Sequence, residues 1–320
     1  NGIGFDDIVM LDPRSAATVG SVARHIARRG TLNLVGQTAL DGLVDTDVGR
    51  LHYDYTAYLG GQGPDIAASY GDARNRCDLH PKGTAVFVGA GGPMGMMHVQ
   101  RAIQQPGGPR RIIATEVSDD RLKTLQERLA PLAENNGCEL LTFNPQSQGQ
   151  SLYDFVMAAT GNQGADDVVV SVPIADVMAE AATVMNPNGM LVFFAGVPNG
   201  TLAPLNLSTV YLNNTQYTGT SGLTMNDQQQ VVDLADKGDL SPACSVGAVG
   251  GMRAAKEGIQ AMIEGRYSGK IIIFPQIHDL PLMGLDELKE KLPEIAEKLD
   301  PGDMWTDEAE KALFEKYWRG

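Results

Sequence analysis

The sequence predicts an α/β fold built around a parallel β-sheet. Two observations support this prediction. Apolar, β-branched runs alternate with segments of helical periodicity, which is the pattern of right-handed βαβ units. A glycine-rich turn also joins the run that begins at Thr84 to the helix that follows it. Such a turn is typical of a Rossmann-type domain, in which the ligand binds at the carboxyl ends of the strands.

The elements of this domain follow one another along the chain. Strands are expected at the apolar runs 84–88, 111–116, 166–173, 190–196 and 217–222. Helices are expected at 94–103, at 174–182 and at 226–237, where Gly238 ends the last one. Asn186-Pro-Asn-Gly189 is typical of a turn between a helix and a strand. Residues 79–280 are therefore expected to form one complete dinucleotide-binding domain.

Residues 1–78 resemble the later half of the same domain. Phe5-Asp-Asp-Ile-Val-Met-Leu-Asp-Pro13 aligns with Ala165-Asp-Asp-Val-Val-Val-Ser-Val-Pro173, and without a gap 31–36 then falls on 191–196. With one residue of slip, 56–60 falls on 215–219. We therefore expect a degenerate half copy that lacks its own glycine loop.

A half copy of this kind leaves strand edges and half of a core exposed. Either preceding residues supply the missing strands, or its three strands extend the sheet of the complete copy. Chance similarity between two βαβ segments is a third interpretation.

Residues 281–320 are expected to form a helical C-terminal extension. An apolar stripe at helical spacing crosses an otherwise charged segment, at Leu285, Leu288, Leu292, Ile295 and Leu299. A second helix is expected at 307–318. Docking of the stripe on the same chain and binding of a partner both remain open.

The loop from Gly89 to Gly95 is the predicted dinucleotide site. Glycines permit a tight turn, and the amides that open the next helix can bind a pyrophosphate. Gly89, Gly91 and Gly95 fit one glycine register, and Ala90, Gly92 and Gly95 fit another, so both remain open. The loop residues expected to bind the cofactor are Gly89, Gly91, Gly92, Pro93, Met94 and Gly95.

An acidic residue ends the next predicted strand. Glu116 lies 21 residues after Gly95 (116 − 95), where a carboxylate can accept both ribose hydroxyls of the adenosine and repels a 2′-phosphate. The expected cofactor is therefore NAD rather than NADP. Arg121, one helical turn further on, is expected along the adenine ribose.

Four further residues end strands on the edge that carries the glycine loop. They are Val172, Gly196, Val197 and Ser221. We expect them to face the nicotinamide end of the cofactor, and mere strand termination is the alternative for each. No catalytic residue can be named from the sequence.

Composition argues against several other functions. The 25 basic residues against 39 acidic ones give a net charge of −14, which disfavours a nucleic-acid partner. No apolar run approaches the roughly 20 residues that cross a bilayer, so no membrane is expected. The cysteines Cys77, Cys138 and Cys244 are far apart, which favours a reducing, cytoplasmic location.

The chain resembles the medium-chain dehydrogenase/reductase superfamily, in particular the zinc alcohol and sorbitol dehydrogenases. The resemblance covers roughly residues 79–275 and rests on Leu79-His-Pro-Lys-Gly83, Gly92-Pro-Met-Gly95, Gly164-Ala-Asp166 and Gly269-Lys-Ile-Ile-Ile-Phe-Pro275. The loop and the tail are most similar to the branch of L-sorbose-1-phosphate reductase. The resemblance implies that Gly92 and Gly95 bind NAD(P) and that Glu116 selects NAD.

The resemblance also implies a zinc site and a substrate cleft in a separate N-terminal domain. This chain departs from that pattern, because no Cys precedes a His-Glu pair, no Cys-x-x-Cys occurs, and the five histidines stand alone. A catalytic zinc needs three convergent ligands and an open position. We therefore expect no metal site in these residues, and zinc only where residues outside the chain supply it.

The predicted function is the cofactor-binding portion of an NAD-dependent alcohol or polyol dehydrogenase. Hydride would pass between NAD and a secondary alcohol of a polyol or sugar phosphate, which is the expected small-molecule partner. A homodimer or a missing N-terminal catalytic domain is the expected protein partner. Two other classes stay open: a non-catalytic dinucleotide-binding or scaffold module, and an S-adenosylmethionine-dependent methyltransferase, which the strand pattern disfavours.

Overall fold

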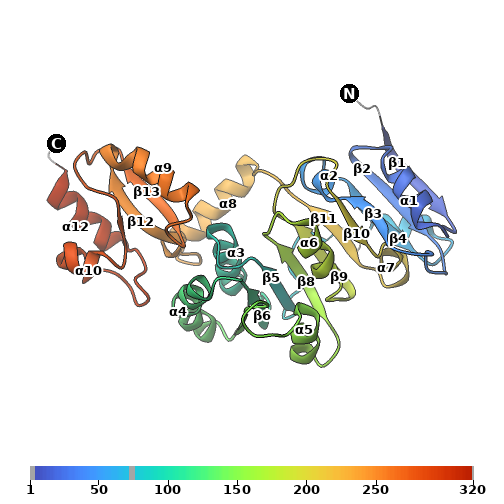
Figure 1. Cartoon of the computed structure of the whole chain (residues 1–320), viewed down its shortest axis with the longest axis horizontal. Coiled ribbons are helices and arrows are strands. Elements are labelled where there is room, and N and C mark those ends of the chain that lie inside the picture. Colours follow the sequence, from blue (N-terminus) through green and yellow to red (C-terminus); the bar gives the residue numbers. More distant parts are fainter. Residues whose placement is uncertain (1–3, 72–75, 319–320) are drawn as a thin grey trace. The chain divides into compact units, whose positions relative to one another are not determined.

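The computed structural model describes residues 4–71 and 76–318, and the chain divides into two compact units (Figure 1). The first unit comprises Asn1–Gly89, Pro106–Val117 and Cys138–Thr224, and the second comprises Ala90–Gln105, Ser118–Gly137 and Met225–Gly320. This division follows packing, whereas the predicted boundaries at 78 and 280 follow sequence similarity and remain a prediction. Within the described ranges, no helix is long and apolar enough to cross a bilayer.

The first unit is built on a nine-stranded sheet in the order β1-β2-β4-β11-β9-β8-β5-β6-β7. Its strands are β1 (Phe5–Leu11), β2 (Ile26–Val35), β4 (Ala57–Gly61), β5 (Thr84–Val88), β6 (Arg111–Thr115), β7 (Glu139–Phe143), β8 (Ala165–Val170), β9 (Met185–Phe193) and β11 (Gln216–Gly219). From β7 to β11 every neighbouring pair is parallel. Their spatial order is that of a doubly wound dinucleotide-binding sheet. The predicted fold class is therefore confirmed.

Helices and a short ribbon complete the first unit. The helices are α1 (Ala16–Ala23), α2 (Val48–Tyr53), the 3₁₀ helix η1 (Ile66–Tyr70), α5 (Leu152–Thr160), α6 (Ala175–Ala182) and α7 (Ser208–Leu212). The antiparallel ribbon pairs β3 (Val44–Asp47) with β10 (Leu202–Leu205). Side chains cap the first turns of four helices, as Ser15, Asp47, Asp65 and Ser151 each accept a hydrogen bond from a backbone amide three residues on.

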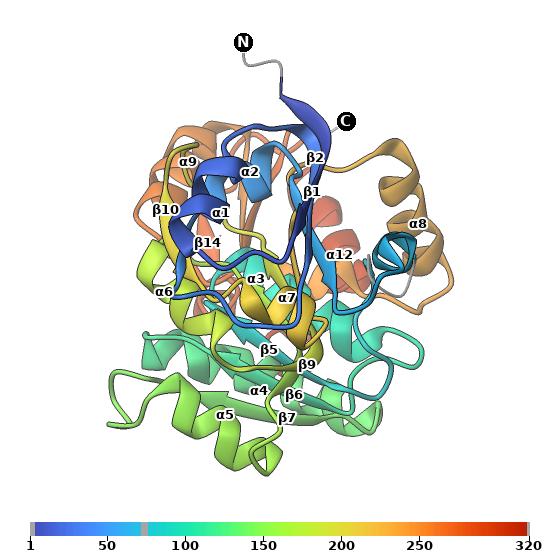
Figure 2. The ribbon, with the colours of Figure 1, turned by 90° about the vertical axis from the view of Figure 1, so that its right-hand side faces the viewer.

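The strands of the half copy extend the sheet of the complete copy. Strands β1, β2 and β4 are parallel to one another, and β4 meets β11 in an antiparallel pairing of Tyr58 with Tyr217. One apolar core joins the two halves, because Leu32 and Leu34 belong to the same cluster as Leu191. The apolar surface that an isolated half copy would expose is thus buried within the chain. Strand β1 is left as one edge of the sheet, with β7 at the other, and faces the viewer in Figure 2.

The two halves exchange helices across this junction. Helix α2 packs against β11 and β9, whereas α7 packs against β4 and β2. Two glycines permit the close approach. A Cβ atom on Gly219 would lie 2.5 Å from the carbonyl oxygen of Leu51, and one on Gly60 would lie 2.8 Å from the Cβ of Tyr211.

The predicted turn at Asn186–Gly189 is wrong. Strand β9 already begins at Met185, and the predicted turn residues form an irregular first part of the strand. The register between β8 and β9 shifts after Ala165, and Asn188 has a positive φ of 67°. A bulge therefore absorbs the Pro-Asn-Gly sequence without ending the strand.

The second unit contains a three-stranded sheet in the order β13-β12-β14. Its elements are α3 (Pro93–Gln104), α4 (Asp119–Asn135), α8 (Met225–Asp236), η3 (Pro242–Ser245), β12 (Val246–Gly251), η4 (Met252–Ala254), α9 (Ala255–Ile263), β13 (Lys270–Phe274), β14 (Met283–Gly284), α10 (Leu288–Lys291), α11 (Pro293–Ala296) and α12 (Asp307–Tyr317). The expected helices at 94–103, 226–237 and 307–318 correspond to α3, α8 and α12.

The apolar stripe of the tail does not lie on one helix. Pro293 opens a new short helix after Leu292, whose backbone is non-helical (φ −143°, ψ 65°), because proline lacks the amide that would continue the first one. The stripe nevertheless docks on its own chain. Leu288 and Ile295 are buried in one core cluster with Trp305 and Leu313. Intramolecular docking is therefore the interpretation that the structure supports.

Candidate cofactor-binding site

The carboxyl ends of six parallel strands form one edge of the first unit. Their last paired residues lie in a single row across the sheet: Phe143, Thr115, Val88, Val170, Phe193 and Gly219. Residues that directly follow these strands must therefore share the same edge. Of the predicted site residues, Gly89 and Glu116 do so, and Val172, Gly196, Val197 and Ser221 come two to four positions after such a strand end.

Gly89 makes the turn that leaves β5. Its φ is +79°, and its amide donates a 2.9 Å hydrogen bond to the carbonyl of Thr115. A Cβ atom at this position would lie 2.5 Å from Cγ2 of Val172. Both the left-handed backbone and the contact with Val172 require glycine here. A turn held this close to the sheet fits the approach of a dinucleotide to the backbone.

Glu116 lies at the end of β6, next to this turn in the sheet. Its amide donates to the carbonyl of Phe143 at 3.1 Å, which continues the pairing with β7. The residue is only 8% exposed, and Oε1 accepts a 2.9 Å hydrogen bond from the amide of Val117. The carboxylate is therefore held at the strand end by local contacts.

Asn144 positions the segment after Glu116, and sequence reasoning did not identify it. The residue is 1% exposed. Its Nδ2 donates to the carbonyl of Val117 at 3.1 Å, and its Oδ1 accepts from the amide of Gln146 at 2.9 Å. An Asn after a strand is usually part of a turn, so nothing in the sequence pointed to a link with the loop after β6.

The strand ends expected near the nicotinamide are covered by residues of the half copy. A Cβ atom on Gly196 would lie 2.4 Å from the hydroxyl of Tyr53. The Tyr55 hydroxyl donates to the carbonyl of Ser221 and lies 3.3 Å from Oγ of Ser221. The side chain of Val197 is buried.

Tyr53, Tyr55 and the neighbouring His52 were missed at the sequence level. Nδ1 of His52, a buried residue, lies 3.1 Å from the carbonyl oxygen of Phe193. These residues lie more than a hundred positions from the strand ends that they contact, and only the pairing of β4 with β11 brings them there. The internal repeat was the one signal that could have suggested this proximity.

The remaining loop residues open helix α3 in the second unit. Gly92 is the N-cap with extended backbone (φ −75°, ψ 163°), and it offers no side chain to the free amides of the first turn. Pro93 takes the first helical position, where its missing amide costs nothing. Gly91 and Gly95 are buried, while Met94 is exposed and its Sδ contacts Nζ of Lys270 at 3.2 Å.

Arg121 lies in the first turn of α4, in the second unit. Its amide donates to the Ser118 side chain, the N-cap of this helix, at 3.4 Å. Its guanidinium lies beside Gly265, where an added Cβ atom would meet Nη2 at 2.8 Å. The expected position of Arg121 along the adenine ribose remains a prediction.

The described residues do not fit a catalytic zinc. In 4–71 and 76–318, no group of three or more His, Cys, Asp or Glu side chains could hold a metal ion. No zinc ligand is therefore assigned in this part of the chain.

Comparison with known proteins gives similarities of three kinds: to a family model, to curated relatives and to solved structures. A family model described as zinc-binding dehydrogenase matches residues 93–237. Mannitol-1-phosphate 5-dehydrogenase of Aliivibrio fischeri is 35% identical over 248 residues, which cover 73% of this chain and 57% of that protein. L-sorbose 1-phosphate reductase of Klebsiella pneumoniae is 28% identical over 243 residues, which cover 73% of this chain and 55% of that protein.

The chain thus spans a little over half the length of these curated relatives. An alcohol dehydrogenase of Thermotoga maritima shares the fold, with a TM-score of 0.50 and 20% identity. That similarity covers 63% of this chain and 53% of the other.

Proposed function

We propose that this chain, which belongs to the zinc-binding dehydrogenase family, binds NAD at the carboxyl edge of β5 and β6. The observation that carries the proposal is the pairing of two features on neighbouring strands. Gly89 turns with a positive φ against Val172, and Glu116 ends the adjacent strand in register. Together they match the two parts of the dinucleotide-binding signature, which are a glycine turn that binds the pyrophosphate and an acidic residue that binds the ribose.

The residues of the chain have binding and orienting roles in this proposal. Gly89 would leave room for the pyrophosphate at the end of β5. Gly91, Gly92 and Gly95 lie in the second unit, where the uncapped amides that open α3 are a separate prediction of phosphate binding. Glu116 would accept hydrogen bonds from the adenosine ribose. Bound NAD supplies a nicotinamide that takes up or releases a hydride.

The proposed substrate is a secondary alcohol of a polyol or sugar phosphate. The support comes from the relatives, which are named for mannitol 1-phosphate and L-sorbose 1-phosphate. Because the chain covers only part of their length, the activity of the whole protein is itself part of the proposal.

Replacement of Glu116, the acid proposed to bind the ribose, tests the cofactor assignment. NAD and NADP are titrated into the wild-type chain and into Glu116→Ala by calorimetry. Loss of hydrogen bonds to a charged acceptor is expected to weaken NAD binding by about tenfold or more. NADP binding should weaken less or improve, because the repulsion of its 2′-phosphate is removed. Glu180→Ala is the matched control, since Glu180 is an exposed acid on α6.

Two results would contradict the proposal. One is the absence of saturable binding of either nicotinamide cofactor by the wild-type chain. The other is an equal effect of Glu116→Ala and Glu180→Ala on NAD affinity, which would mean that Glu116 does not touch the ribose.

A non-catalytic dinucleotide-binding module is the second candidate. It is favoured by the contacts of Tyr53 with Gly196 and of Tyr55 with Ser221, because these strand ends were expected to face the reacting end of the cofactor. NAD binding without turnover of any polyol phosphate, measured on the longest natural gene product that contains this chain, would select it over the dehydrogenase.

A further inference from the structure

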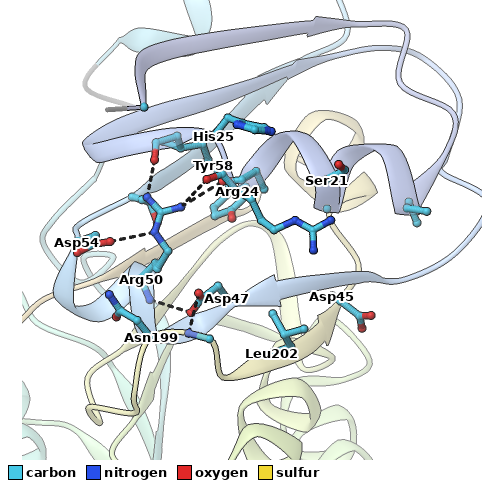
Figure 3. A pocket seen from close by; sticks show the side chains of 18 of the residues that line it. Ser21, Arg24, His25, Asp45, Asp47, Arg50, Asp54, Tyr58, Asn199 and Leu202 are labelled. Carbon is cyan, nitrogen blue, oxygen red and sulfur yellow. Dashed lines mark hydrogen bonds and ion pairs between the residues drawn. The ribbon is translucent and has the colours of Figure 1, made fainter. Parts of the chain in front are cut away.

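The first unit holds a pocket on the same edge of the sheet as the proposed cofactor site, but beside the strands of the half copy and not beside β5 and β6, because β4 runs antiparallel to β11. It lies at the amino ends of β2 and β4 and has a volume of about 1310 Å³. Helix α1, strand β3, helix α2 and the segment 199–202 before β10 form its walls. Figure 3 shows these elements around an open interior. The pocket is lined by residues of the first unit alone, and nothing in the proposed function uses it.

Small residues on α1 create the space. Ala16, Ala17, Gly20 and Ser21 line the pocket. At the repeat offset of 160 residues, the complete copy has Asp176, Val177, Glu180 and Ala181 instead. A concave pocket of this size, open to solvent beside a helix with small side chains, has room for a ligand.

Arg50 neutralises the end of α1 that borders the pocket. Its Nε donates to Asp54 at 2.9 Å, and its Nη1 donates to the carbonyl of Ala23 at 3.3 Å. Its Nη2 donates to the carbonyl of Ile26, and Figure 3 draws these bonds. The carbonyl end of a helix ordinarily repels anions. Here the guanidinium covers these carbonyls, so an anion can lie nearby.

Two further arginines line the pocket without an acidic partner. Neither Arg24 nor Arg28 forms an ion pair with any residue in the described ranges. The side chain of Arg24 extends into the pocket in Figure 3. Arg28 lies over the ring of Tyr55, 5.9 Å from its centroid.

Further polar groups line the pocket, and Asp41 and Asp47 are among them. Asp45 on β3 and Asn199 before β10 line the pocket, and the structure pairs neither side chain with another described residue. Thr56 is 2% exposed, and its hydroxyl oxygen has no partner among residues 4–71 and 76–318. A buried polar atom without a partner calls for an explanation such as a missing ligand or water.

We propose that this pocket binds a phosphate ester that carries several hydroxyl groups. The guanidinium of Arg24, supported by Arg28, binds the phosphate, because its planar fork matches phosphate oxygens. Asp45 accepts hydrogen bonds from the hydroxyl groups, and the amide of Asn199 accepts and donates them. Sugar phosphates and nucleotides share this chemistry. The site would be the chain's second ligand site and does not depend on the proposed NAD site.

Calorimetric titration of three probes tests the proposal on the full chain. The probes are mannitol 1-phosphate, AMP and unphosphorylated mannitol. Each is titrated into the wild type, Arg24→Ala and Arg14→Ala. Arg14 is the matched control, because it is an exposed arginine of the same unit that pairs with Asp12 outside this pocket. AMP also suits the NAD site, so its titration is repeated in Glu116→Ala.

At least one phosphate ester is expected to bind saturably, and mannitol is expected not to bind. Arg24→Ala should lower the affinity for the ester by about tenfold or more, because a charge-assisted hydrogen bond is lost. Arg14→Ala should leave this affinity unchanged. The ester whose affinity depends on Arg24 shows whether the ligand is a sugar phosphate or a nucleotide.

Three results would overturn the proposal: no saturable binding of either ester, equal effects of Arg24→Ala and Arg14→Ala, or equal affinity for mannitol and its phosphate. NAD binding serves as the separate readout for the proposed function. It should respond to Glu116→Ala and not to Arg24→Ala, so failure of one site leaves the other testable.

Discussion

At the scale of single residues, two consecutive acids fix the start of β5 against β8. Asp166 Oδ2 accepts a 2.7 Å hydrogen bond from the amide of Thr84. Asp167 is fully buried, pairs with Arg76 and accepts a 2.6 Å hydrogen bond from the amide of His80. The aligned Asp6 and Asp7 of the half copy are exposed. Asp7 accepts hydrogen bonds from the hydroxyl of Tyr70 at the surface, so identical residues in the repeat make buried contacts in one copy and exposed contacts in the other.

Removal of Arg76 should destabilise the chain in a pH-dependent manner. Burial raises the pKa of Asp167, and Arg76 opposes that rise. Arg76→Ala leaves a buried carboxylate without its partner, which is expected to cost about 3–5 kcal/mol of unfolding free energy near pH 7. A folded-state pKa above the unfolded value means that the native state binds the proton more tightly. Stability should therefore fall as the pH rises from about 4 through the raised pKa.

Urea denaturation between pH 4 and pH 8 measures this effect. Arg253→Ala is the control, because Arg253 pairs with Asp279 on the surface and such pairs contribute at most about 1 kcal/mol. Equal losses in the two variants, or a loss for Arg76→Ala that does not change with pH, would show that Asp167 is not an uncompensated buried charge.

At the scale of elements, the exchange of α2 and α7 between the halves depends on two strand-end glycines. Gly219 lets the backbone of α2 approach β11, and Gly60 lets α7 approach β4. Neither position has a positive φ, so these glycines are needed for space and not for backbone conformation. The helices in turn cover the β4–β11 junction, where a single antiparallel pairing joins the two sets of parallel strands.

Gly219→Ala should disrupt this junction. The new methyl group would meet the backbone of Leu51 and His52, and backbone cannot rotate away as a side chain can. Overpacking of this kind is expected to cost about 1–3 kcal/mol, measured by chemical denaturation. Gly63→Ala is the control, because nothing lies within 4 Å of an added Cβ atom there and its φ is not positive. A Gly219→Ala variant as stable as Gly63→Ala would mean that α2 does not hold its close position.

At the scale of the whole molecule, the sheet of the first unit has a well-buried centre and a weakly protected edge. All five residues of β5 are buried, and the strand pairs on both sides. Strand β1 pairs only with β2 and exposes most of its residues, including Phe5 and Leu11. The chain therefore covers the β11 edge with its own half copy and leaves an edge at β1.

Hydrogen exchange should resolve this gradient. The amides of β1 that bond to β2 are expected to open with a free energy at least about 2 kcal/mol below that of β5, because edge strands open locally. Mass spectrometry of exchanged peptides compares the two strands within one sample, and β8 serves as an internal reference for a buried strand. Equal protection of β1 and β5 would indicate that another chain covers the β1 edge in solution.

Most strands of the complete copy could be predicted because they depend on local periodicity and turn residues, whereas β7, α4 and α5 were not placed from the sequence. The glycine turn and the acid after the next strand could be placed on one edge, since parallel strands end on the same side. The turn at Asn186–Gly189 and the single helix for the apolar stripe of the tail were predicted wrongly. A β-bulge lets β9 continue through the predicted turn, and Pro293 divides the predicted helix of the stripe. Whether a bulge or a proline ends an element depends on pairing and packing with distant parts of the chain.

The sequence by itself determined the fold class, the family resemblance and the Gly89–Glu116 pair, because each depends on residues that are near in sequence or joined by a regular βαβ unit. Only the tertiary structure decided that the half copy joins the sheet through Tyr58 and Tyr217. It also placed Tyr53 and Tyr55 over the strand ends expected to face the nicotinamide, and it revealed the pocket beside α1. These features depend on packing between segments far apart in the chain, where edge exposure and side-chain volume determine which surfaces meet.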